Sequence, residues 1–538
     1  VATSQSAVSV TLDRMPDGGI HGPSFEALVD RLKQLGTVEV EHPCAVVSIV
    51  GRRIRAVLHD LGPALEVLGD RPVHLVSDSS EDLNLSLVVG EADGASLVAR
   101  LHERLFPAQG EEGRLGPTWE QIVHLRRTAH DDGSGPRTRR PDGDRDHPLG
   151  TDRVGGPGES RAKGTWWRAE RARLLDSVTD GEARYVYHLP TVAAAARRLR
   201  ETLGSVDRFY YSMKANAHPD VLRTVANAGL GIECVSAAEI ETVRRILGEE
   251  CPILFTPNFC PVDEYETALA AGADVTLDGY ELLQLHAPIF RGHAVGVRVD
   301  PGRGLGHHQH VRTAGSRSKF GMPMPEIGAF VEAAHRAGAR VTGIHAHVGS
   351  GIFDPQAWAQ TGQLLAEAAE RIPSLEWMDL GGGLGVPERP GQEPLDLEAM
   401  EPLLSKLRSR LPGCRLRLEP GRYLVSEAGV LVAPVTQVRR KNGTNLVGIA
   451  TGMNSLIRPA LYGAWHGIHN LTRLDEGPVD YWNIVGPICE SSDVLGRDRW
   501  LPPMKVGDVV LIENAGAYGA VMSSRYNQRP PAAEIVLD

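Results

Sequence analysis

The stretch Phe209-Tyr-Tyr-Ser-Met-Lys214-Ala-Asn216 decides the fold class of this chain. A mostly apolar run of strand length ends at a lysine, and Pro219 then opens a helical pattern that places Val221, Leu222 and Val225 on one face. A lysine at the carboxyl end of a strand, followed by a crossover helix, stands where barrel enzymes keep their chemistry. A single lysine of this kind is usually just solvated, so the prediction depends on the residues that follow.

Strand-like runs alternate with amphipathic helical patterns over the next two hundred residues. The candidate strands are FYYSM (209–213), IECV (232–235), ILFT (253–256), VTL (275–277), VGVRV (295–299), TGIHAH (342–347), WMDL (377–380) and RLRLE (415–419). One helix start is well marked, because Ser236 and Glu239 have the spacing of a capping box. Eight strands with crossover helices over ~210 residues predict an α/β fold of the (β/α)8 barrel type, which we place at 165–425.

Polar residues cluster at the carboxyl ends of these strands. They are Lys214, Ser236, Asp278, His345, His347, Gly381, Gly382, Gly383 and Glu419, with Gly421 and Arg422 directly after the last strand. Taken singly, a histidine here would be structural and a glycine would serve a turn. Since the carboxyl ends of barrel strands meet on one face, we expect these side chains to line one pocket.

These residue types together favour one cofactor. Backbone N–H groups of a glycine triplet can approach a phosphate closely, and an arginine can neutralise it. A strand-end lysine can form a Schiff base, a carboxylate can keep a pyridine nitrogen protonated, and a histidine can cover the ring face. Pyridoxal 5'-phosphate has a phosphate, an aldehyde that forms a Schiff base, and a pyridine ring, so it suits all of these residues. The six cysteines form no C-x-x-C pair, and we expect no metal site.

The sequence pattern changes after the predicted barrel. Short β-like runs punctuated by glycine and proline predict a C-terminal β-domain at 426–538, and residues 183–203 are candidates to pair with it. Three stretches carry unusual polar content, at 452–462, 486–493 and 514–519. In the second, Cys489 stands beside Glu490 after a Gly-Pro pair, which makes the two a candidate acid–base pair.

Residues 1–106 have a different pattern. Strands are expected at VSVTLD, TVEVEH, CAVVSIVG, VHLVSDSS and LNLSLVVG, and helices at 25–35, 55–68 and 95–105. This order predicts a ferredoxin-like α+β module without catalytic machinery. Residues 107–164 lose periodicity and are rich in Gly, Pro and mixed charge, so we expect a flexible linker.

Composition limits the partners. The chain has 538 residues and a formal net charge of −11, which argues against nucleic acid or an anionic membrane as a partner. No apolar run approaches the ~20 residues of a membrane span, no signal peptide is recognisable, and scattered cysteines suit a cytoplasmic protein. Because the first residue is Val1, we expect a piece of a longer polypeptide.

The motifs of residues 165–538 resemble the fold-type III pyridoxal-phosphate decarboxylases, most closely the diaminopimelate decarboxylases. The resemblance rests on YSMKAN (211–216), ECVSAAE (233–239), SKFG (318–321), HAHVGSG (345–351), DLGGGLG (379–385), EPGR (419–422), RPALYGA (458–464), GPICESSD (486–493) and GAYG (516–519). It implies a barrel of the alanine-racemase type with a C-terminal β-domain. It also implies conversion of meso-2,6-diaminopimelate to L-lysine and carbon dioxide, the last step of lysine biosynthesis.

The resemblance also implies roles at the cofactor. Lys214 would hold pyridoxal phosphate covalently, His347 would stack on its ring, and Glu419 would pair with the pyridine nitrogen. The remaining cofactor contacts would come from Ser350, Gly381, Gly382, Gly383, Gly421, Arg422 and Tyr518.

Substrate contacts are implied in the same way. Arg422, Arg458 and Tyr462 would bind the distal carboxylate, Glu490 would take the distal ammonium, and Tyr518 would lie near the substrate. Cys489 would donate the proton that replaces carbon dioxide. In that family Cys489 and Glu490 come from the partner subunit, so the resemblance implies a homodimer with shared active sites. His347, with Lys214 and Cys489, belongs to the catalytic set.

Residues 1–106 resemble the C-terminal regulatory ACT region of aspartokinases. The matching words are ATSQSAVSVTLD (2–13), CAVVSIVG (44–51) and SDSSEDLNLSLVVG (77–90). The whole chain therefore looks like the C-terminal part of a bifunctional aspartate kinase/diaminopimelate decarboxylase. The kinase domain is absent from this chain, and L-lysine is the candidate effector of the ACT region.

Rival functions remain open at this point. An ornithine- or arginine-type decarboxylase shares the fold, but its substrate has no distal carboxylate and would leave an arginine pair without a partner. An amino-acid racemase suits Cys489 and Glu490 less well. A non-catalytic lysine sensor on a degenerate barrel would bind lysine without a cofactor absorption band.

Overall fold

A computed structural model describes most of the chain. The described residues are 2–3, 8–9, 23–34, 38, 40, 44–50, 73–78, 84–105, 166–302 and 318–538. The chain forms two compact units, Val1–Asp142 and Gly143–Asp538. The expected helix at 55–68, the linker at 107–164 and the His- and Arg-rich tract at 303–317 lie outside the described residues, and most of the expected strands VSVTLD and TVEVEH do too.

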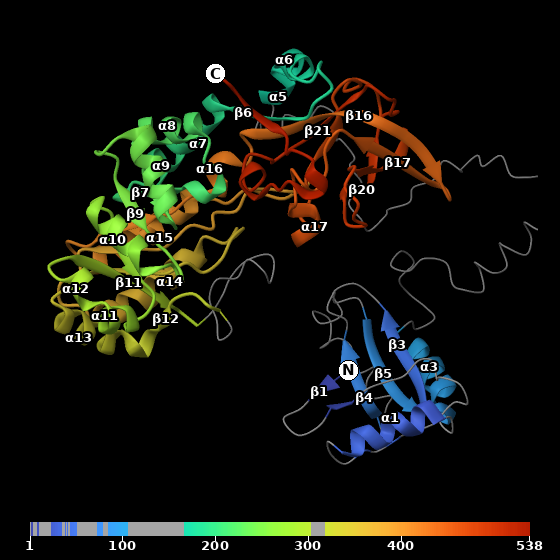
Figure 1. Ribbon diagram of the computed structural model, residues 1–538, viewed down its shortest axis with the longest axis horizontal. Helices are drawn as coiled ribbons and strands as arrows, with labels where there is room; N and C mark the ends of the chain where they lie inside the picture. Colours follow the sequence, from blue (N-terminus) through green and yellow to red (C-terminus); the bar gives the residue numbers. More distant parts are fainter. Residues whose placement is uncertain are drawn as a thin grey trace, which may run out of the picture. The chain divides into compact units, whose positions relative to one another are not determined.

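The first unit contains a three-stranded antiparallel sheet in the order β3-β5-β4 (Figure 1). The strands are β3 (Cys44–Val50), β4 (Val73–Asp78) and β5 (Asn84–Gly90), next to the short pair β1 (Ala2–Thr3) and β2 (Val8–Ser9). Helix α1 (Pro23–Lys33) lies close to its expected position, whereas α3 (Glu91–Leu105) begins four residues early. Its acidic first turn, with Glu91 and Asp93, suits a helix N-terminus and explains the earlier start.

The second unit contains the predicted barrel. Within 166–302 and 318–538, eight parallel strands follow one another around the barrel, and the last pairs with the first. They are β7 (Arg208–Ser212), β8 (Gly231–Cys234), β9 (Ile253–Phe255), β10 (Asp274–Leu277), β11 (Ala294–Asp300), β13 (Arg340–His345), β14 (Trp377–Asp379) and β15 (Arg415–Leu418). Each predicted strand is confirmed, and the short β12 (Met322–Pro323) lies beside β11.

Helices surround the barrel (Figure 1). They are α7 (Leu189–Thr202), α8 (Pro219–Asn227), α9 (Ala237–Leu247), α10 (Val262–Ala270), α11 (Glu281–Leu285), α12 (Ala287–Phe290), α13 (Ile327–Ala337), α14 (Gln356–Ala369) and α15 (Leu397–Arg410). At α9 the Ser236 hydroxyl accepts from the Glu239 N–H at 3.3 Å, as the capping box predicts. The Glu239 carboxylate reaches back one residue further than expected, to the Val235 N–H at 2.7 Å.

The C-terminal β-domain is a mixed sheet that also takes in a strand from before the barrel. Its strands are β16 (Gly429–Lys441), β17 (Thr444–Ile449), β18 (Ile468–Asn470), β19 (Asp480–Val485), β20 (Val494–Leu501), β21 (Val509–Ile512) and β22 (Ala533–Leu537). Strand β6 (Arg184–His188) pairs antiparallel with β16 and parallel with β22. Short helices α5 (Trp166–Ala169), α6 (Arg171–Asp176), α16 (Arg422–Val425) and α17 (Arg458–Tyr462) complete the unit.

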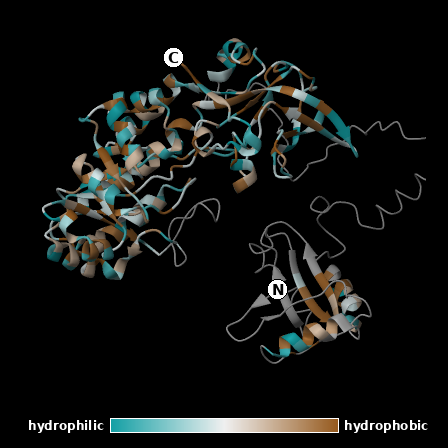
Figure 2. Cartoon of the chain, in the orientation of Figure 1, coloured by the Kyte–Doolittle hydropathy of each residue, from teal (hydrophilic) through white to brown (hydrophobic). Residues whose placement is uncertain are grey.

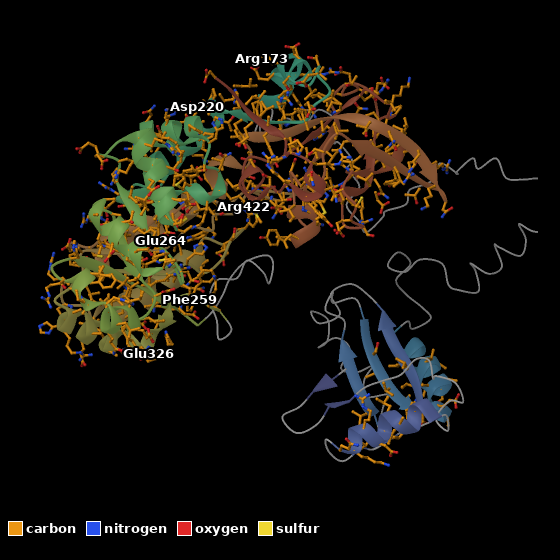
Figure 3. The ribbon with its side chains drawn as sticks, viewed as in Figure 1. Arg173, Asp220, Phe259, Glu264, Glu326 and Arg422 are labelled. Atoms are coloured by element: carbon orange, nitrogen blue, oxygen red, sulfur yellow. The ribbon has the colours of Figure 1, made fainter. Side chains whose placement is uncertain are left out.

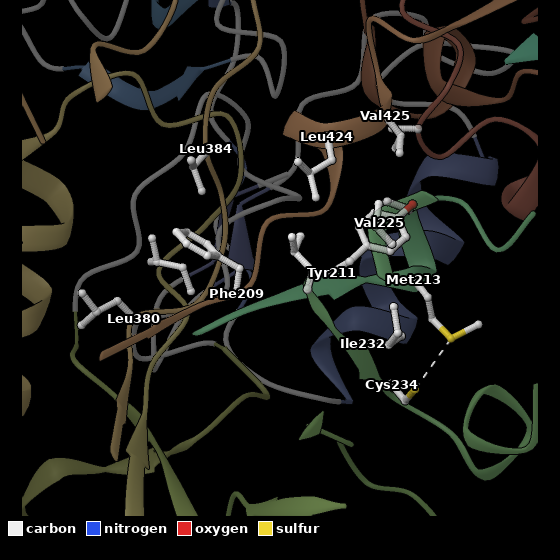
Figure 4. Packing of buried hydrophobic residues seen from close by; sticks show 14 of the residues in the cluster. Phe209, Tyr211, Met213, Val225, Ile232, Cys234, Leu380, Leu384, Leu424 and Val425 are labelled. Atoms are coloured by element: carbon white, nitrogen blue, oxygen red, sulfur yellow. Dashed lines mark hydrogen bonds between the residues drawn. The ribbon is translucent and has the colours of Figure 1, made fainter. Parts of the chain in front are cut away.

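Buried apolar residues of the barrel strands and the surrounding helices form one large cluster, and Tyr210, Leu254 and Trp377 of the strands form a separate small one. Figure 4 shows Phe209 and Tyr211 of β7 with Ile232 and Cys234 of β8, and the Cys234 thiol lies 3.7 Å from the Met213 sulfur. The surrounding helices carry hydrophilic as well as hydrophobic residues (Figure 2). Among the described residues, no helix is both long enough and apolar enough to cross a membrane.

Candidate active site

Lys214 lies directly after β7, in the 3-10 turn η3 (Met213–Ala215). Its Nζ donates to both carboxylate oxygens of Glu233 on β8, each at 2.7 Å. The Thr256 hydroxyl donates to the same carboxylate at 2.5 Å. Burial alone would lower the pKa of Lys214, but Glu233 and then Glu419 raise it above its ordinary value. The Glu233 side chain is 0% exposed and that of Lys214 39% exposed, so a fully buried carboxylate holds a lysine whose side chain is partly open to solvent.

Three acid–base side chains come together at the ends of β13, β14 and β15. One side-chain nitrogen of His345 and one carboxylate oxygen each of Asp379 and Glu419 all lie within 4.8 Å of one another. The His345 Nε2 is 3.2 Å from Glu419 Oε1. Glu419 Oε1 is buried and makes no hydrogen bond. Burial raises the pKa of Glu419 well above its ordinary value, raises that of Asp379 to about 7 and lowers that of His345 well below its ordinary value.

The glycine triplet forms a tight cradle after β14. A Cβ on Gly382 would lie 2.1 Å from the Glu419 carbonyl oxygen, and one on Gly383 would lie 2.2 Å from the Gly349 carbonyl oxygen. The Gly382 N–H donates to His347 Nδ1 at 3.1 Å, which fixes the imidazole against the cradle. Burial, reinforced by the Arg298 charge, lowers the pKa of His347 to about 3, so the ring is neutral at pH 7.

Arg422 begins α16 at the junction of barrel and β-domain, where Figure 3 labels it. Its Nη2 donates to the Ser350 hydroxyl at 3.0 Å. Gly421 precedes it, and a Cβ there would lie 3.0 Å from Ser212 Cβ. The Tyr518 N–H donates to the Ala215 carbonyl at 2.8 Å, which places Tyr518 of the β-domain beside the lysine turn.

A second buried arginine comes from the β-domain. Arg458 opens α17, and its Nη1 lies 3.2 Å from His466 Nε2. Because the other His466 nitrogen lies 2.8 Å from the Glu513 carbonyl oxygen, that nitrogen carries the proton and Nε2 accepts from Arg458. Arg422 Nη1 and Arg458 Nη2 both donate to Glu388 Oε1, at 2.7 and 2.9 Å. Tyr462, four residues after Arg458, ends the same helix.

Two predicted residues lie elsewhere in this subunit. Cys489 and Glu490 are exposed, in the turn between β19 and β20. The Cys489 N–H donates to Asn527 Oδ1 at 2.8 Å, and the Tyr526 hydroxyl donates to Glu490 at 2.5 Å. These bonds stay within the β-domain.

Sequence reasoning missed four residues that the structure brings to the site. They are Glu233, Arg298, Asp379 and Glu388. The first two stand inside apolar runs, IECV and VGVRV, and a charge within a buried strand is a usable signal. Asp379 likewise lies within the run WMDL, whereas nothing in the loop sequence around Glu388 marks it.

The described residues fit pyridoxal phosphate. A partly exposed lysine with a buried carboxylate partner suits the aldehyde, and the Glu419 oxygen without a hydrogen-bond partner suits the pyridine nitrogen. A buried carboxyl group of this kind needs a partner, and a pyridinium N–H supplies one. The glycines let the backbone pack against the Glu419 and Gly349 carbonyls, where side chains would collide.

Comparisons with known proteins agree with this geometry. Residues 189–426 match the family model "Pyridoxal-dependent decarboxylase, pyridoxal binding domain". The chain is 37% identical over 384 residues to the diaminopimelate decarboxylase of Methanothermobacter thermautotrophicus, covering 69% of this chain and 89% of that protein. It is 32% identical over 396 residues to the enzyme of Escherichia coli K12, covering 68% and 94%.

A solved structure agrees with the fold as well. The diaminopimelate decarboxylase of Helicobacter pylori, complexed with L-lysine, superposes with a TM-score of 0.64 at 27% identity, covering 68% of this chain and 94% of that one. The two sequence relatives are matched over about nine-tenths of their own length. The chain therefore belongs to the diaminopimelate decarboxylase family of pyridoxal-dependent decarboxylases.

Proposed function

We propose that this chain decarboxylates meso-2,6-diaminopimelate to L-lysine and carbon dioxide with pyridoxal phosphate as its cofactor. The observation that carries the substrate is the convergence of two buried arginines, Arg422 and Arg458, on a single carboxylate oxygen. Such a pair is a ready-made site for a carboxylate at the far end of a substrate. Substrates without that carboxylate, such as ornithine or arginine, would gain no binding energy from the pair.

Bound pyridoxal phosphate would supply an electron sink for the bond that breaks. The chain's own residues hold it and manage protons. Lys214 would bind its aldehyde carbon, and Glu233 is the nearest base to take a proton from Nζ, at 2.7 Å. Glu419 would accept a hydrogen bond from the pyridine nitrogen, and His347, fixed by Gly382, would cover the ring. Ser350, Gly381–Gly383, Gly421 and Tyr518 would hold the phosphate.

The distal end of the substrate would be bound by residues at and beyond the end of the barrel. Arg422, Arg458 and Tyr462 would take the distal carboxylate, and this presents the other stereocentre to the cofactor. Cys489 would donate the proton that replaces carbon dioxide, and Glu490 would take the distal ammonium. Because both are exposed in this subunit, we propose that they act in the site of a second copy.

A substrate comparison tests the proposed reaction. We expect kcat/KM for carbon dioxide release from meso-diaminopimelate to exceed that from ornithine, arginine or lysine by at least about a hundredfold, since only meso-diaminopimelate has a second carboxylate that can make charge-assisted hydrogen bonds to both arginines. A preference for ornithine or arginine would establish the rival decarboxylase. Lysine binding with no turnover of any of the four amino acids would establish the sensor.

Subunit mixing tests the shared site. Lys214→Ala and Cys489→Ala each disable one component, so in a mixed dimer one site carries both lesions and the other carries neither. Dissociating and reassociating the two inactive variants at equal concentration should restore about a quarter of the wild-type activity, as random pairing requires. If activity stays at the level of the separate variants, Cys489 does not cross to a second subunit.

Two further proposals concern the whole chain. Residues 1–106 would form an ACT-type regulatory module with L-lysine as effector, supported by the antiparallel β3-β5-β4 sheet. Since lysine is also the expected product, binding to this module must be measured with the Arg458→Gln variant, whose active site should bind lysine weakly. Six scattered cysteines without a C-x-x-C pair suit a reducing compartment, and we propose the cytoplasm.

A further inference from the structure

The carboxylate of Glu388 lies where the proposed substrate carboxylate should be. Glu388 belongs to the loop between β14 and α15, a few residues after the glycine cradle. Its Oε1 accepts from Arg422 Nη1 at 2.7 Å and from Arg458 Nη2 at 2.9 Å. The two arginine side chains are each 6% exposed and the Glu388 side chain is 16% exposed. A side chain of this chain therefore occupies the convergence point of the arginine pair.

The arginine donors leave little room for a second anion. Arg422 Nη2 is engaged by Ser350, and Arg458 Nη1 by His466. Their remaining Nη atoms, which point to a common place, are both on Glu388. Arg422 Nε is buried and makes no hydrogen bond, so the pairing with Glu388 is incomplete. An incoming carboxylate must displace Glu388 to take the position where one oxygen accepts from both arginines.

Two hydrogen bonds hold the loop backbone at and just before Glu388. The Glu388 N–H donates to Gln392 Oε1 at 3.0 Å, and the preceding Pro387 carbonyl accepts from Asn514 Nδ2 at 3.1 Å. The loop is thus anchored to the β-domain at the residue before Glu388. Rotation about the side-chain bonds alone can move the carboxylate off the arginines, at little cost to the loop.

We propose that Glu388 is an internal competitor for the distal carboxylate and sets the affinity of the site for substrate and product. The inference rests on the proposed function, since it identifies the displaced position with the distal carboxylate subsite. With no amino acid bound, Glu388 neutralises one of two buried positive charges and keeps both arginines oriented. Substrate binding replaces it, and its return helps to expel L-lysine, which keeps a carboxylate at the same place.

Removing the charge should tighten binding. When an internal occupant fills a site most of the time, the apparent affinity falls by the fraction of time that the site is free. If Glu388 occupies the arginine pair about nine-tenths of the time, Glu388→Gln should lower the Kd of L-lysine by about tenfold. KM for meso-diaminopimelate should fall in the same direction. Both are measured on the full chain loaded with cofactor. The lysine Kd is taken from the shift of the cofactor absorption band, which reports the active site and not residues 1–106, and KM is taken from carbon dioxide release.

A matched control distinguishes an effect of Glu388 itself from the effect of removing any negative charge from this loop. Glu393→Gln removes an exposed carboxylate from the same loop and should leave the lysine Kd unchanged. Glu388→Asp keeps the charge but shortens the reach by one methylene, so it should tighten lysine binding by a smaller factor. It also serves as the test if Glu388→Gln does not fold. A lysine Kd that is unchanged or higher in these Glu388 variants contradicts the proposal and makes Glu388 a positioning residue of the arginines.

A probe that is independent of turnover keeps this test separate from that of the proposed function. Glutarate has a carboxylate for the arginine pair and no amine for the cofactor. At matched ionic strength it should raise the Tm of Glu388→Gln more than that of the wild type or of Glu393→Gln. Equal shifts would overturn the internal competitor. If the wild-type enzyme does not decarboxylate meso-diaminopimelate, the proposed function fails, and the glutarate comparison still decides whether Glu388 competes for the arginines.

Discussion

The two halves of the site are built differently. The cofactor half consists of residues at the ends of neighbouring barrel strands, such as Lys214, Glu233 and Glu419, and its positions follow from the closed parallel sheet. The substrate half is assembled from separate elements: Arg422 starts α16 after the barrel, Arg458 starts α17 in the β-domain, and Glu388 comes from a loop.

The two halves differ in how their buried charged groups are paired. In the cofactor half both oxygens of Glu233 accept from Lys214, whereas Glu419 Oε1 is buried and makes no hydrogen bond. In the substrate half the arginines already hold a carboxylate of the chain itself. We therefore expect lesions in the first half to act mainly on kcat and lesions in the second mainly on KM or on stability.

The largest effect should come from Lys214→Ala. It removes the nitrogen that would bind the cofactor and the only cation paired with buried Glu233 among the described residues. Turnover should fall by roughly three orders of magnitude or more. Carbon dioxide release measures it, with exposed Lys406→Ala as the control. Substantial turnover by the variant without added amine would remove Lys214 from the mechanism.

An intermediate effect is expected for Arg458→Gln. Loss of a charge-assisted hydrogen bond to a carboxylate costs about 1.5–3 kcal/mol, or roughly a 10- to 150-fold loss in kcat/KM. The distal carboxylate is bound equally in ground and transition states, so the loss should fall on KM and leave kcat nearly unchanged. Steady-state kinetics beside exposed Arg440→Gln will separate the two. A loss confined to kcat would place Arg458 in the cofactor half.

The smallest effect concerns stability and pH. Burial, and then the Arg458 charge, lower the pKa of His466 to about 4. Below pH ~6.5 the unfolded chain takes up a proton that the folded chain refuses, so wild-type stability falls as the pH falls from about 6.5 to about 4. His466→Gln should destabilise the protein by about 1 kcal/mol at pH 7, because Arg458 loses a well-placed acceptor.

That destabilisation should shrink as the pH falls through the same window, because the variant lacks the titrating group. Urea unfolding at pH 7.0, 6.0 and 5.0 measures it. A difference between variant and wild type that stays constant or grows toward pH 5 would show that His466 is protonated in the folded state.

The sequence was most informative about the barrel. Eight strand-like runs, with residues of interest at the ends of six of them, placed Lys214, Gly381–Gly383 and Glu419 on one face, because the carboxyl ends of parallel strands must meet there. The structure confirms the strands and brings these residues together, while their chemical roles stay predictions. Glu233 was within reach of the same reasoning, since a glutamate inside the run IECV needs a buried partner.

The substrate half could not be predicted in this way. Arg458 and Tyr462 were expected from a motif, but the contact of Glu388 with two arginines joins three elements without a common periodicity. It depends on the angle between barrel and β-domain and on the anchoring of one loop through Asn514. Strand β6 is similar, since its pairing with β16 and β22 joins segments about 240 and 350 residues apart.

One measurement tests the central claim most directly. An absorption spectrum of the cofactor-loaded chain should be recorded before and after addition of meso-diaminopimelate, with carbon dioxide release followed in parallel. We predict a visible cofactor band that shifts on addition and is accompanied by stoichiometric gas release. No band in protein supplied with pyridoxal phosphate, or a shift without carbon dioxide, would contradict the assignment of this chain as a diaminopimelate decarboxylase.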